Sequence, residues 1–504
     1  MTDLPKVDCA EYDKIVQTLN PKSITLVFPA AHVNSPASMF GHTFLRVNSQ
    51  YDSKLLSYAV NYAADADPDK ENAALFAIKG LFGGYFGKYS LMPYYEKLKE
   101  YRDSEQRDIW EYDLDLSKEE TMAMVRHIWE LNETRSYYYF FTQNCSYNML
   151  WFLEVARPTL HLREKFNFQV IPFETVQVVQ DENIVTNKSY RPSKRTLLLK
   201  YEELILERDI KLPMLLSDLK IEVNSVINDE TIDAQQKKYI LEASIELLQY
   251  KRSKNKIDEK SYIKRFHELS KARATLKQGD IISVTPPENP INGHRAIRAI
   301  VGAGLREGRG IAYLGVRPAY HDLTDSNVGY FRGTQIEFLD FELSKTGNKT
   351  ELEKLTLLSI ASLAQQSKFF SNFSWRTKFG WDKDLTNHKT NFSGTVGAGA
   401  NYGGKSAYTY MMVDPLFYYD NGFKAAIGGS IGLIVDKYNF SNTKLEATKR
   451  FYDSGFEQNI FTIIQGFRSS KNSQVQFGYE FKDRLLNNKK RSDDSFRVNL
   501  NYYF

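Results

Sequence analysis

From about residue 294 to residue 504 the chain alternates between apolar and polar side chains, and this pattern restricts its fold more than any other feature. In the final segment, FRVNLNYYF (496–504), every second residue from Phe496 onward is large and apolar. The segments VQFGYEF (475–481) and FKAAIGGSI (423–431) show the same period of two, which indicates β-strands with two unlike faces. About twelve such segments of roughly 8–13 residues follow one another, a pattern typical of a transmembrane β-barrel.

A soluble β-sandwich is the alternative fold, and the aromatic residues argue against it. Aromatics make up 14% of the chain, with 32 Tyr and 32 Phe, although mean hydropathy is −0.46. They gather at segment ends and include the terminal Phe504, as the aromatic girdles of a membrane barrel require. The sequence has no run of about 18 apolar residues, so no spanning helix is expected. We therefore predict an all-β transmembrane barrel of about 12 antiparallel strands.

The chain divides into three predicted regions. Its 504 residues are too many for one ordinary core, so two or three units are expected. Residues 1–200 mix strand and helix patterns and predict an α+β domain. Residues 201–283 repeat apolar residues with helical spacing and predict a helical connector. A proline-rich stretch, VTPPENPING (284–293), then opens the barrel, which is predicted over residues 284–504.

An even number of strands would leave both ends of the barrel on one face. Bacterial barrels keep their short turns on the periplasmic side, so residues 1–280 are expected in the periplasm, beneath the outer membrane. The start, MTDLPKVDCAEY, does not read as a signal peptide, so an exported chain is expected to have lost its signal. The net charge of +4 gives no reason to expect nucleic acid as a partner.

Cys145 is one of only two cysteines, and it stands in QNCSYNMLWFLEVARP (143–158). Asn144 is a favourable N-cap, so Cys145 is predicted in the first turn of a helix that ends before Pro158. A helix N-terminus lowers the pKa of a thiol and offers N–H groups to an oxyanion. The residues alone leave three roles open: a nucleophile, a small buried core residue, or half of a disulfide with Cys9.

A thiolate nucleophile needs a base, and His42 is the candidate among eight histidines. It begins the predicted strand HTFLRV (42–47) and would be held rigidly, although a hydrogen-bonded core histidine is the alternative. His32 lies ten residues earlier without nearby cysteines or paired carboxylates, so no metal site is predicted there or elsewhere. No cofactor is expected.

A segment rich in glycine and aromatics, KGLFGGYFGKYSLMPYY (79–95), is predicted to be a pliable lipid or substrate loop. Lys79 and Lys88 are candidates for lipid phosphate. Tyr85, Tyr94 and Tyr95 suit an acyl chain or a membrane interface. A packed surface loop is the alternative.

The order of these motifs resembles the permuted papain-like fold, in which a strand-borne His precedes an "NC" nucleophile, as in lecithin:retinol acyltransferase-type enzymes. More specifically, the N-terminal third is identified as a member of the Lnb N-terminal periplasmic domain family. The segments that carry the resemblance are LNPKSITLVFPAAHVNSPASMFGHTFLRVNS (19–49), LLSYAVNYAA (55–64), KGLFGGYFGKYSLMPYYEKLKEY (79–101), RDIWEYDLDLS (107–117) and QNCSYNMLWFLEVARP (143–158). The barrel is similar to barrels attached to this domain in some bacteria.

The resemblance implies a lipoprotein N-acyltransferase. Such an enzyme moves an acyl chain from a phospholipid, through a thioester on Cys145, to the α-amine of a diacylated lipoprotein's N-terminal cysteine. His42 would take the thiol proton, and Asn61, in the stretch NYAAD, would orient the imidazole. Asn144 and the N–H of Cys145 would hold the oxyanion.

Three polar residues just before His42 are expected to line the pocket, although ordinary turn chemistry also explains them: Asn34, Ser35 and Ser38. Other functions stay open. Water as the acceptor would give a phospholipase, and amide cleavage would give a thiol amidase or peptidase. A non-enzymatic barrel with a periplasmic binding domain is the remaining alternative. The sequence does not fix the oligomeric state.

Overall fold

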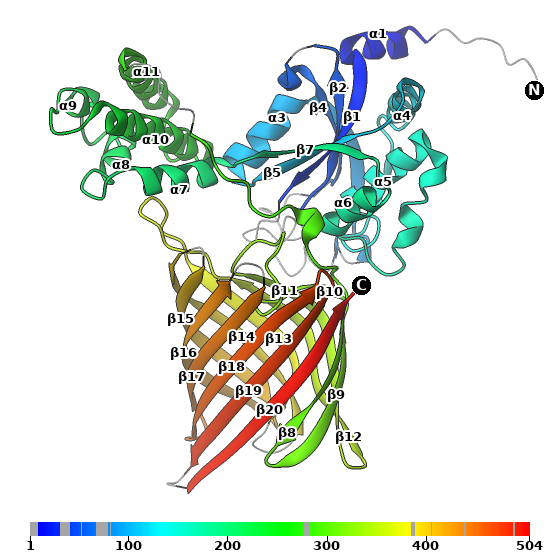
Figure 1. Cartoon of the computed structure of the whole chain (residues 1–504), viewed down its shortest axis with the longest axis vertical. Coiled ribbons are helices and arrows are strands. Elements are labelled where there is room, and N and C mark those ends of the chain that lie inside the picture. Colours follow the sequence, from blue (N-terminus) through cyan, green and yellow to red (C-terminus); the bar gives the residue numbers. More distant parts are fainter. Residues whose placement is uncertain are drawn as a thin grey trace, which may run out of the picture. The chain divides into compact units, whose positions relative to one another are not determined.

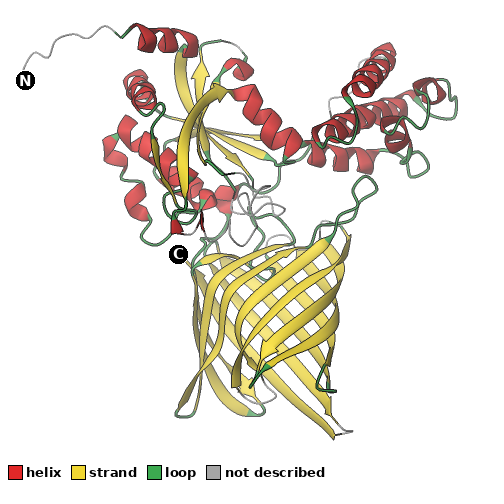
Figure 2. Cartoon of the chain, turned by 180° about the vertical axis from the view of Figure 1, so that it is seen from behind, coloured by secondary structure: helices red, strands yellow, loops and turns green. Residues whose placement is uncertain are grey.

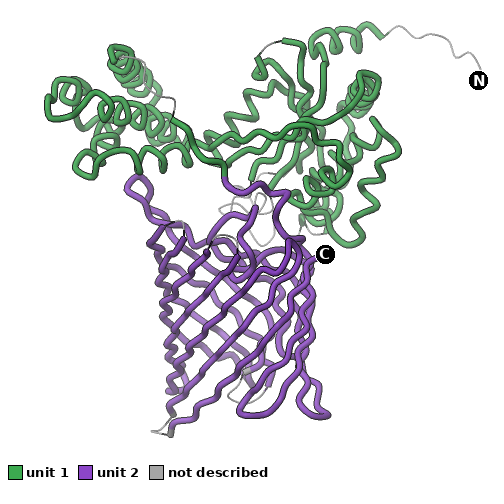
Figure 3. Tube along the Cα trace, in the orientation of Figure 1, with its two compact units in different colours: residues 1–286 green, residues 287–504 purple. Residues whose placement is uncertain are grey.

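The computed structural model describes residues 9–30, 41–51, 53–66, 79–80, 82–276, 282–384, 389–404, 406–437, 440–486 and 489–504. The chain forms two compact units, Met1–Pro286 and Pro287–Phe504 (Figure 3). The division falls within the predicted proline-rich boundary.

The N-terminal part of the first unit is built around a seven-stranded sheet (Figure 1). Its strands run in the order β6-β4-β3-β2-β1-β5-β7, and every neighbouring pair is antiparallel. The predicted strands at 23–29 and 42–47 correspond to β1 and β2. The bounds are β1 (Pro21–Pro29), β2 (Phe44–Ser49), β3 (Tyr58–Ala64), β4 (Tyr85–Pro93), β5 (Ile109–Leu114), β6 (Arg135–Tyr138) and β7 (Val185–Arg191).

Helices beside this sheet begin where capping residues stand in the sequence. Ser117 caps the predicted helix α4 (Lys118–Glu130) through a reciprocal capping box with Glu120. Asn144 caps α5 (Cys145–Ala156), which ends before Pro158 as expected. The other helices around the sheet are α1 (Ala10–Leu19), α3 (Tyr94–Leu98) and α6 (Pro172–Asp181), and the π-helical segment η3 (Lys99–Ser104) follows α3.

Helices make up the rest of the first unit, as predicted for the connector. The two longest, α10 (Ala234–Ser253) and α11 (Glu259–Thr275), begin at Asp233 and Asp258, whose side chains accept backbone N–H bonds. The others are α7 (Lys194–Leu204), α8 (Leu212–Ser217) and α9 (Val223–Ile227). α7 runs across residue 200, the boundary predicted between the α+β domain and the connector.

The second unit is a closed antiparallel barrel (Figure 2). Within the described residues, twelve strands form the ring, which closes because β20 pairs with β8 and β9 pairs with β11. The short strand β10 also pairs with β11 and is not counted among the twelve. The strand bounds are β8 (Arg298–Arg306), β9 (Arg309–Arg317), β10 (Ala319–His321), β11 (Thr334–Thr346), β12 (Lys349–Ser362), β13 (Ser374–Asp384), β14 (Lys389–Gly403), β15 (Ala407–Tyr419), β16 (Phe423–Lys437), β17 (Ser441–Tyr452), β18 (Glu457–Ser470), β19 (Ser473–Leu486) and β20 (Lys489–Tyr503).

The alternation read from the sequence becomes an apolar exterior and a polar interior. Along β20, Leu500 and Tyr502 are exposed, whereas Asn499 and Asn501 are buried inside. Ion pairs cross the interior, among them those of Arg376 with Asp414 and Glu446, Arg497 with Glu342, and Lys354 with Asp340. A cavity of about 480 Å³ with charged walls lies among them. An apolar outer band around a closed ring is what a bilayer requires of a barrel.

Both ends of the barrel sheet lie at the same barrel end, as an even strand number requires. The N–H of Phe504 donates to the carbonyl of Ile297 at 2.9 Å. The connections 318–333 and 363–373 also lie at this end, and they are longer than the described turns at the other. This differs from the short turns expected beside the termini. The reason is local: residues 319–330 bury charged side chains that pair with barrel residues.

Among the residues that the structure describes, no helix is both long and apolar enough to cross a membrane.

Candidate active site

Cys145 is the first residue of α5, and Asn144 fixes that helix start. The Asn144 side-chain oxygen accepts the backbone N–H bonds of Ser146 at 3.0 Å and Tyr147 at 3.2 Å. Cys145 is 3% exposed. The thiol therefore lies at the positive end of the helix, in surroundings where water screens little of that charge.

His42 and Asn61 come together from two neighbouring strand segments. His42 lies two residues before β2, and Asn61 lies in β3, with its side chain 3% exposed. His42 Nε2 and Asn61 Oδ1 are 2.6 Å apart. An amide oxygen only accepts hydrogen bonds, so Nε2 carries the proton and Nδ1 is left to face the thiol. The ring of Tyr101 stacks on the imidazole, with 5.7 Å between centroids, and restricts its rotation.

The electrostatics of this group favour a thiolate. Burial alone would raise the pKa of the Cys145 thiol, but the charge of His42 and its hydrogen bond to the thiol outweigh burial. The pKa falls from 9.0 to about 6. A cysteine beside a histidine that a third group orients is the arrangement of a thiol nucleophile and its base. The structure thus brings together the three residues predicted as catalytic.

Two hydroxyl groups support the thiol from the side of the sheet. Thr43 donates a hydrogen bond of 2.7 Å to the Ser146 hydroxyl, which lies 3.7 Å from the sulfur of Cys145. Both hydroxyls are fully buried. Because Thr43 follows His42 in the chain and Ser146 follows Cys145, this bond fixes the base and the nucleophile relative to each other.

Tyr138 is a member of the site that the sequence did not point to. It ends β6, and its hydroxyl accepts the backbone N–H of Cys145 at 3.2 Å. Burial, and next the neighbouring Cys145, raise the pKa of Tyr138 well above its ordinary value, so its hydroxyl keeps its proton. A protonated hydroxyl beside the nucleophile is a hydrogen-bond donor for a developing oxyanion. The local sequence, RSYYYFF (135–141), contains five consecutive aromatic residues. Its pattern does not indicate which of them packs against Cys145.

The structure bears on the three roles that the sequence left open for Cys145: nucleophile, buried core residue, or half of a disulfide. Cys9 and Cys145 are both free thiols, Cys9 exposed and Cys145 buried. The disulfide alternative is therefore wrong. Cys145 is buried, as a small core residue would be, but its polar partners set it apart from an inert one.

The polar atoms of Asn144 are all engaged. Its amide nitrogen donates to the carbonyls of Phe140 at 3.0 Å and Val170 at 2.6 Å. Both amide hydrogens are then used, in addition to the two bonds that the oxygen accepts. The structure gives this side chain a capping role, and the predicted oxyanion role would require one of these bonds to break.

The glycine- and aromatic-rich segment is not the pliable loop that was predicted. Residues 85–93 form β4, inside the seven-stranded sheet. The glycines make room for aromatic rings, because a Cβ at Gly87 would lie 2.1 Å from the Tyr62 ring. Tyr85 and Tyr94 are buried, and Tyr94 donates to Glu111 at 2.6 Å. Because Tyr94 is buried inside the domain, it does not contact lipid. The Lys79 ammonium lies over the Tyr85 ring.

The outer face of β4 and β6 does expose aromatic and basic groups. Phe86 and Tyr137 are both about half exposed and stack with 4.9 Å between their centroids. Lys88 stands opposite Arg135 across the same two strands and pairs with Asp65. Tyr95, just beyond β4, is also exposed. We call Phe86, Tyr137, Lys88 and Arg135 the β4–β6 patch. The predicted pocket residues Asn34, Ser35 and Ser38 lie outside the described residues.

The sequence of the first unit matches the model of a known protein family. Residues 11–182 match the model of a family described as the Lnb N-terminal periplasmic domain. The first unit contains an Lnb domain. The family resemblance read from the sequence is thus confirmed. Residues 188–284 and 287–503 match two further families, each described as a domain of unknown function, DUF7842 and DUF7840. No curated protein matches the chain.

Among solved structures, the barrel that follows the Lnb domain is similar to porins. NanC porin is 8% identical, with 41% of this chain and 100% of that one covered at a TM-score of 0.28. KdgM porin is 12% identical over 41% and 99%, with a TM-score of 0.27. An anion-selective porin from Comamonas acidovorans is 9% identical over 41% and 98%, with a TM-score of 0.23. The barrel assignment itself follows from the strand pairing of this chain.

The location of the protein follows from its two units. A closed barrel with an apolar exterior belongs in an outer membrane, and the Lnb domain is described as periplasmic. The chain is an outer-membrane β-barrel protein with a periplasmic N-terminal domain.

Proposed function

We propose that the Lnb domain is a thiol-dependent acyltransferase that takes an acyl chain from a phospholipid and passes it to the α-amine of a diacylated lipoprotein. The observation that carries this proposal is the Cys145–His42–Asn61 group, with a thiol pKa of about 6. At the near-neutral pH of the periplasm such a thiol is mostly ionised, and its basic partner is already in place.

The first half-reaction would form a thioester. The Cys145 thiolate attacks the ester carbonyl of the phospholipid, and the carbonyl oxygen becomes an oxyanion. When the oxyanion collapses, the carbon–oxygen bond to glycerol breaks. The protonated His42 imidazole gives its proton to the leaving alkoxide, so a lysophospholipid departs and the acyl chain stays on sulfur.

Donors for the oxyanion are available at the helix start. The backbone N–H of Cys145 and the hydroxyl of Tyr138 meet at 3.2 Å beside the sulfur. Their mutual bond would open to admit the substrate oxygen, and each donor would then point to it. This arrangement does not require the Asn144 side chain, which stays engaged as the cap.

The second half-reaction would return the thiol. His42, now neutral, takes a proton from the attacking amine, and the amine nitrogen bonds to the thioester carbon. The carbon–sulfur bond breaks and Cys145 leaves as a thiolate, which completes an amide on the acceptor. Asn61 keeps Nδ1 of His42 turned to the reacting atoms in both steps, because Nε2 is held at 2.6 Å.

The β4–β6 patch supports a lipid as the acyl donor. Stacked, exposed aromatic rings suit the interface between headgroups and acyl chains. Lys88 and Arg135 are cations beside them that suit a lipid phosphate. The Lnb family resemblance supports the lipoprotein amine as acceptor, and the barrel, crossed by internal ion pairs, supports a role as an anchor in the outer membrane.

Intact-protein mass spectrometry tests this function. The full-length protein in detergent would be incubated with phospholipid vesicles and then with a synthetic diacylated lipopeptide. We expect the wild type to gain one acyl mass that neutral hydroxylamine removes, and the lipopeptide to gain that acyl group on its amine. Cys145→Ala should gain nothing. Cys9→Ser is the matched control, because Cys9 is the other, exposed thiol, and it should behave as wild type.

Each other outcome has a definite meaning. An acyl adduct that is lost to water, with no change in the lipopeptide, would make the protein a phospholipase. An adduct that forms equally on Cys145→Ala would remove Cys145 from the chemistry. No adduct on any variant, with the fold intact, would contradict the acyltransferase.

A further inference from the structure

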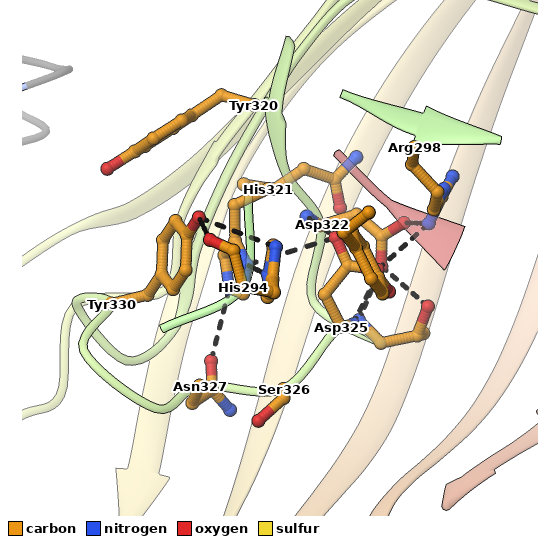
Figure 4. A network of polar contacts seen from close by, with 12 residues as sticks. His294, Arg298, Tyr320, His321, Asp322, Asp325, Ser326, Asn327 and Tyr330 are labelled. Atoms are coloured by element: carbon orange, nitrogen blue, oxygen red, sulfur yellow. Dashed lines mark hydrogen bonds and ion pairs between the residues drawn. The ribbon is translucent and has the colours of Figure 1, made fainter. Parts of the chain in front are cut away.

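A cluster of two histidines and a carboxylate lies at the end of the barrel that carries its termini, and the proposed acyl transfer does not use it (Figure 4). His294 precedes β8, His321 ends β10, and Asp325 follows in the same connection. The exposed fractions of these residues are 1%, 1% and 0%. No sequence pattern marks them as a group, because His294 and His321 lie 27 positions apart and meet only in the folded barrel.

Hydrogen bonds fix which nitrogen of each histidine carries a proton. His294 Nδ1 lies 2.6 Å from the carbonyl of Arg295, an atom that only accepts, so Nδ1 is protonated. His321 Nε2 lies 3.2 Å from the side-chain oxygen of Asn327. The orientation of that amide is fixed, because its nitrogen donates to Asp436 at 2.9 Å. His321 Nε2 is therefore protonated too.

The remaining ring nitrogens are then two lone pairs that face each other. His294 Nε2 and His321 Nδ1 are 3.2 Å apart. An Asp325 carboxylate oxygen lies 3.8 Å from His321 Nδ1, and all three atoms lie within 4.8 Å of one another. The two imidazole lone pairs repel each other unless an electrophile lies between them. The Asp325 oxygen accepts from Arg317 at 2.6 Å and from the N–H of Asp322 at 3.0 Å, and it is the carboxylate atom nearest to the pair.

The spacing suits a tetrahedral metal ion. Two imidazole nitrogens bonded to one zinc ion stand roughly 3.3 Å apart, given Zn–N bonds of about 2.0–2.1 Å. The outer N–H groups of both rings are bonded to oxygen atoms, as is usual for histidines that bind a metal. Imidazole ligands select zinc and similar transition metals over magnesium or calcium. A third ligand from Asp325 would leave the fourth position to water.

The charge around the cluster allows a cation despite two arginines. Arg298 and Arg317 both contact Asp325. They also reach three other carboxylates, those of Asp322, Glu337 and Asp340. With Lys354, which pairs with Asp340, the described residues place three cations among four carboxylates. Among these side chains the carboxylates outnumber the cations by one, so the local charge does not oppose a bound cation.

We propose that His294, His321 and Asp325 bind one divalent transition-metal ion of the zinc type. The ring of Tyr330 stacks on both imidazoles, at 4.4 and 4.3 Å between centroids, and shields the site from water. The ion ties the connection after β10 to the residue that leads into β8. It therefore holds these two segments together at the end of the barrel that carries its termini. The metal ligands belong to the second unit and take no part in the thiol site of the first unit.

Metal analysis of the purified full chain in detergent tests this site. The protein would be stripped with a chelator, dialysed against zinc or magnesium, and its metal content measured by elemental mass spectrometry. We expect about one zinc ion per chain and no magnesium. Cobalt in place of zinc should show the intense visible absorption of a tetrahedral site. His294→Gln and His321→Gln should each lose the zinc.

Two controls separate this site from others. His267→Gln removes an exposed histidine of α11, and Cys145→Ala removes the thiol; both should keep the zinc. The wild type provides a readout that survives if a ligand variant fails to fold, because zinc should raise its melting temperature. No zinc on the wild type, an octahedral cobalt spectrum, or full zinc binding by both histidine variants would overturn the proposal. If the wild type binds no zinc, the facing ring nitrogens of His294 and His321 share a proton instead of a metal ion.

Discussion

His42 donates a hydrogen bond from Nε2 to the side-chain oxygen of Asn61 at 2.6 Å. The bond sets the tautomer of the base and the direction in which Nδ1 points. Asn61→Ala should therefore slow thioester formation about 100-fold, the usual cost of a misplaced catalytic group. Asn61→Asp keeps an acceptor at the same place and should retain most of the rate. Single-turnover acylation measures both, and equal loss in the two variants would mean that Asn61 has another role.

The charge state of Cys145 predicts the pH dependence of acylation. Its pKa is lowered to about 6, so the thiolate, and with it the acylation rate, should be half-maximal near that pH and should fall below it. His42→Ala removes the neighbour that does most to lower the pKa and leaves burial, which raises it, so the pKa should rise. Ultraviolet absorbance of the thiolate, taken as wild type minus Cys145→Ala, follows this directly. A wild-type midpoint near 9 would contradict the ion pair.

Tyr138 and Tyr137 are neighbours with opposite surroundings, and this gives a matched pair of variants. Tyr138 is buried against Cys145, whereas Tyr137 is exposed. Tyr138→Phe should lower the acylation rate about 10²–10³-fold, as the loss of one oxyanion donor does, and should leave the titration of Cys145 near 6. Tyr137→Phe should change little. Equal rates for the two variants would leave the oxyanion to backbone donors alone.

The β4–β6 patch predicts a difference between vesicles and dispersed substrates. Phe86→Ser removes one of the two stacked, exposed rings. We expect slower acylation by phospholipid in vesicles and an unchanged rate with a short-chain, water-soluble ester, because only the first substrate needs interfacial contact. Phe82→Ser is the control, since Phe82 is more exposed and lies outside the strand pair. A loss with both substrates would indicate damage to the fold.

Glu111 predicts how acid weakens the first unit. Its carboxylate contacts Arg46 at 2.8 Å, both side chains are fully buried, and Arg191 bonds to it as well. Burial raises the pKa of Glu111, but Arg46 and Arg191 outweigh it, and the pKa falls from 4.5 to about 2. Because the folded pKa is the lower one, the stabilisation is complete above pH 4.5 and is lost as the pH falls towards 2.

Removing this carboxylate should cost most above pH 4.5, where its stabilisation is complete. Glu111→Gln leaves Arg46 buried beside a neutral group and should lower the free energy of unfolding by about 3–5 kcal/mol. Glu130→Gln, at a largely exposed carboxylate paired with His127, is the control and should cost little. Thermal unfolding at pH 7 and pH 3 compares the variants. A wild-type stability that is the same at both values would contradict the depressed pKa.

Local patterns in the sequence predicted the features that depend on neighbouring residues. The alternation in 496–504, the Ser117 cap and the start of α5 at Cys145 each follow from a few consecutive side chains. β4 was mistaken for a loop, because glycines signal turns locally, whereas Gly87 is needed for a ring that arrives from β3. Tyr138 was missed for the same reason: its contact with Cys145 depends on how β6 pairs with β4.

The closure of the barrel between β8 and β20 has a consequence for the order of synthesis. β20 leaves the ribosome after the other strands of the ring, and until it pairs with β8 the sheet has two open edges, which a bilayer does not tolerate. A message that stops short of β20 would still encode every residue of the thiol site. Its product would have no closed ring to hold it in the outer membrane, so attachment of the domain depends on the synthesis of β20.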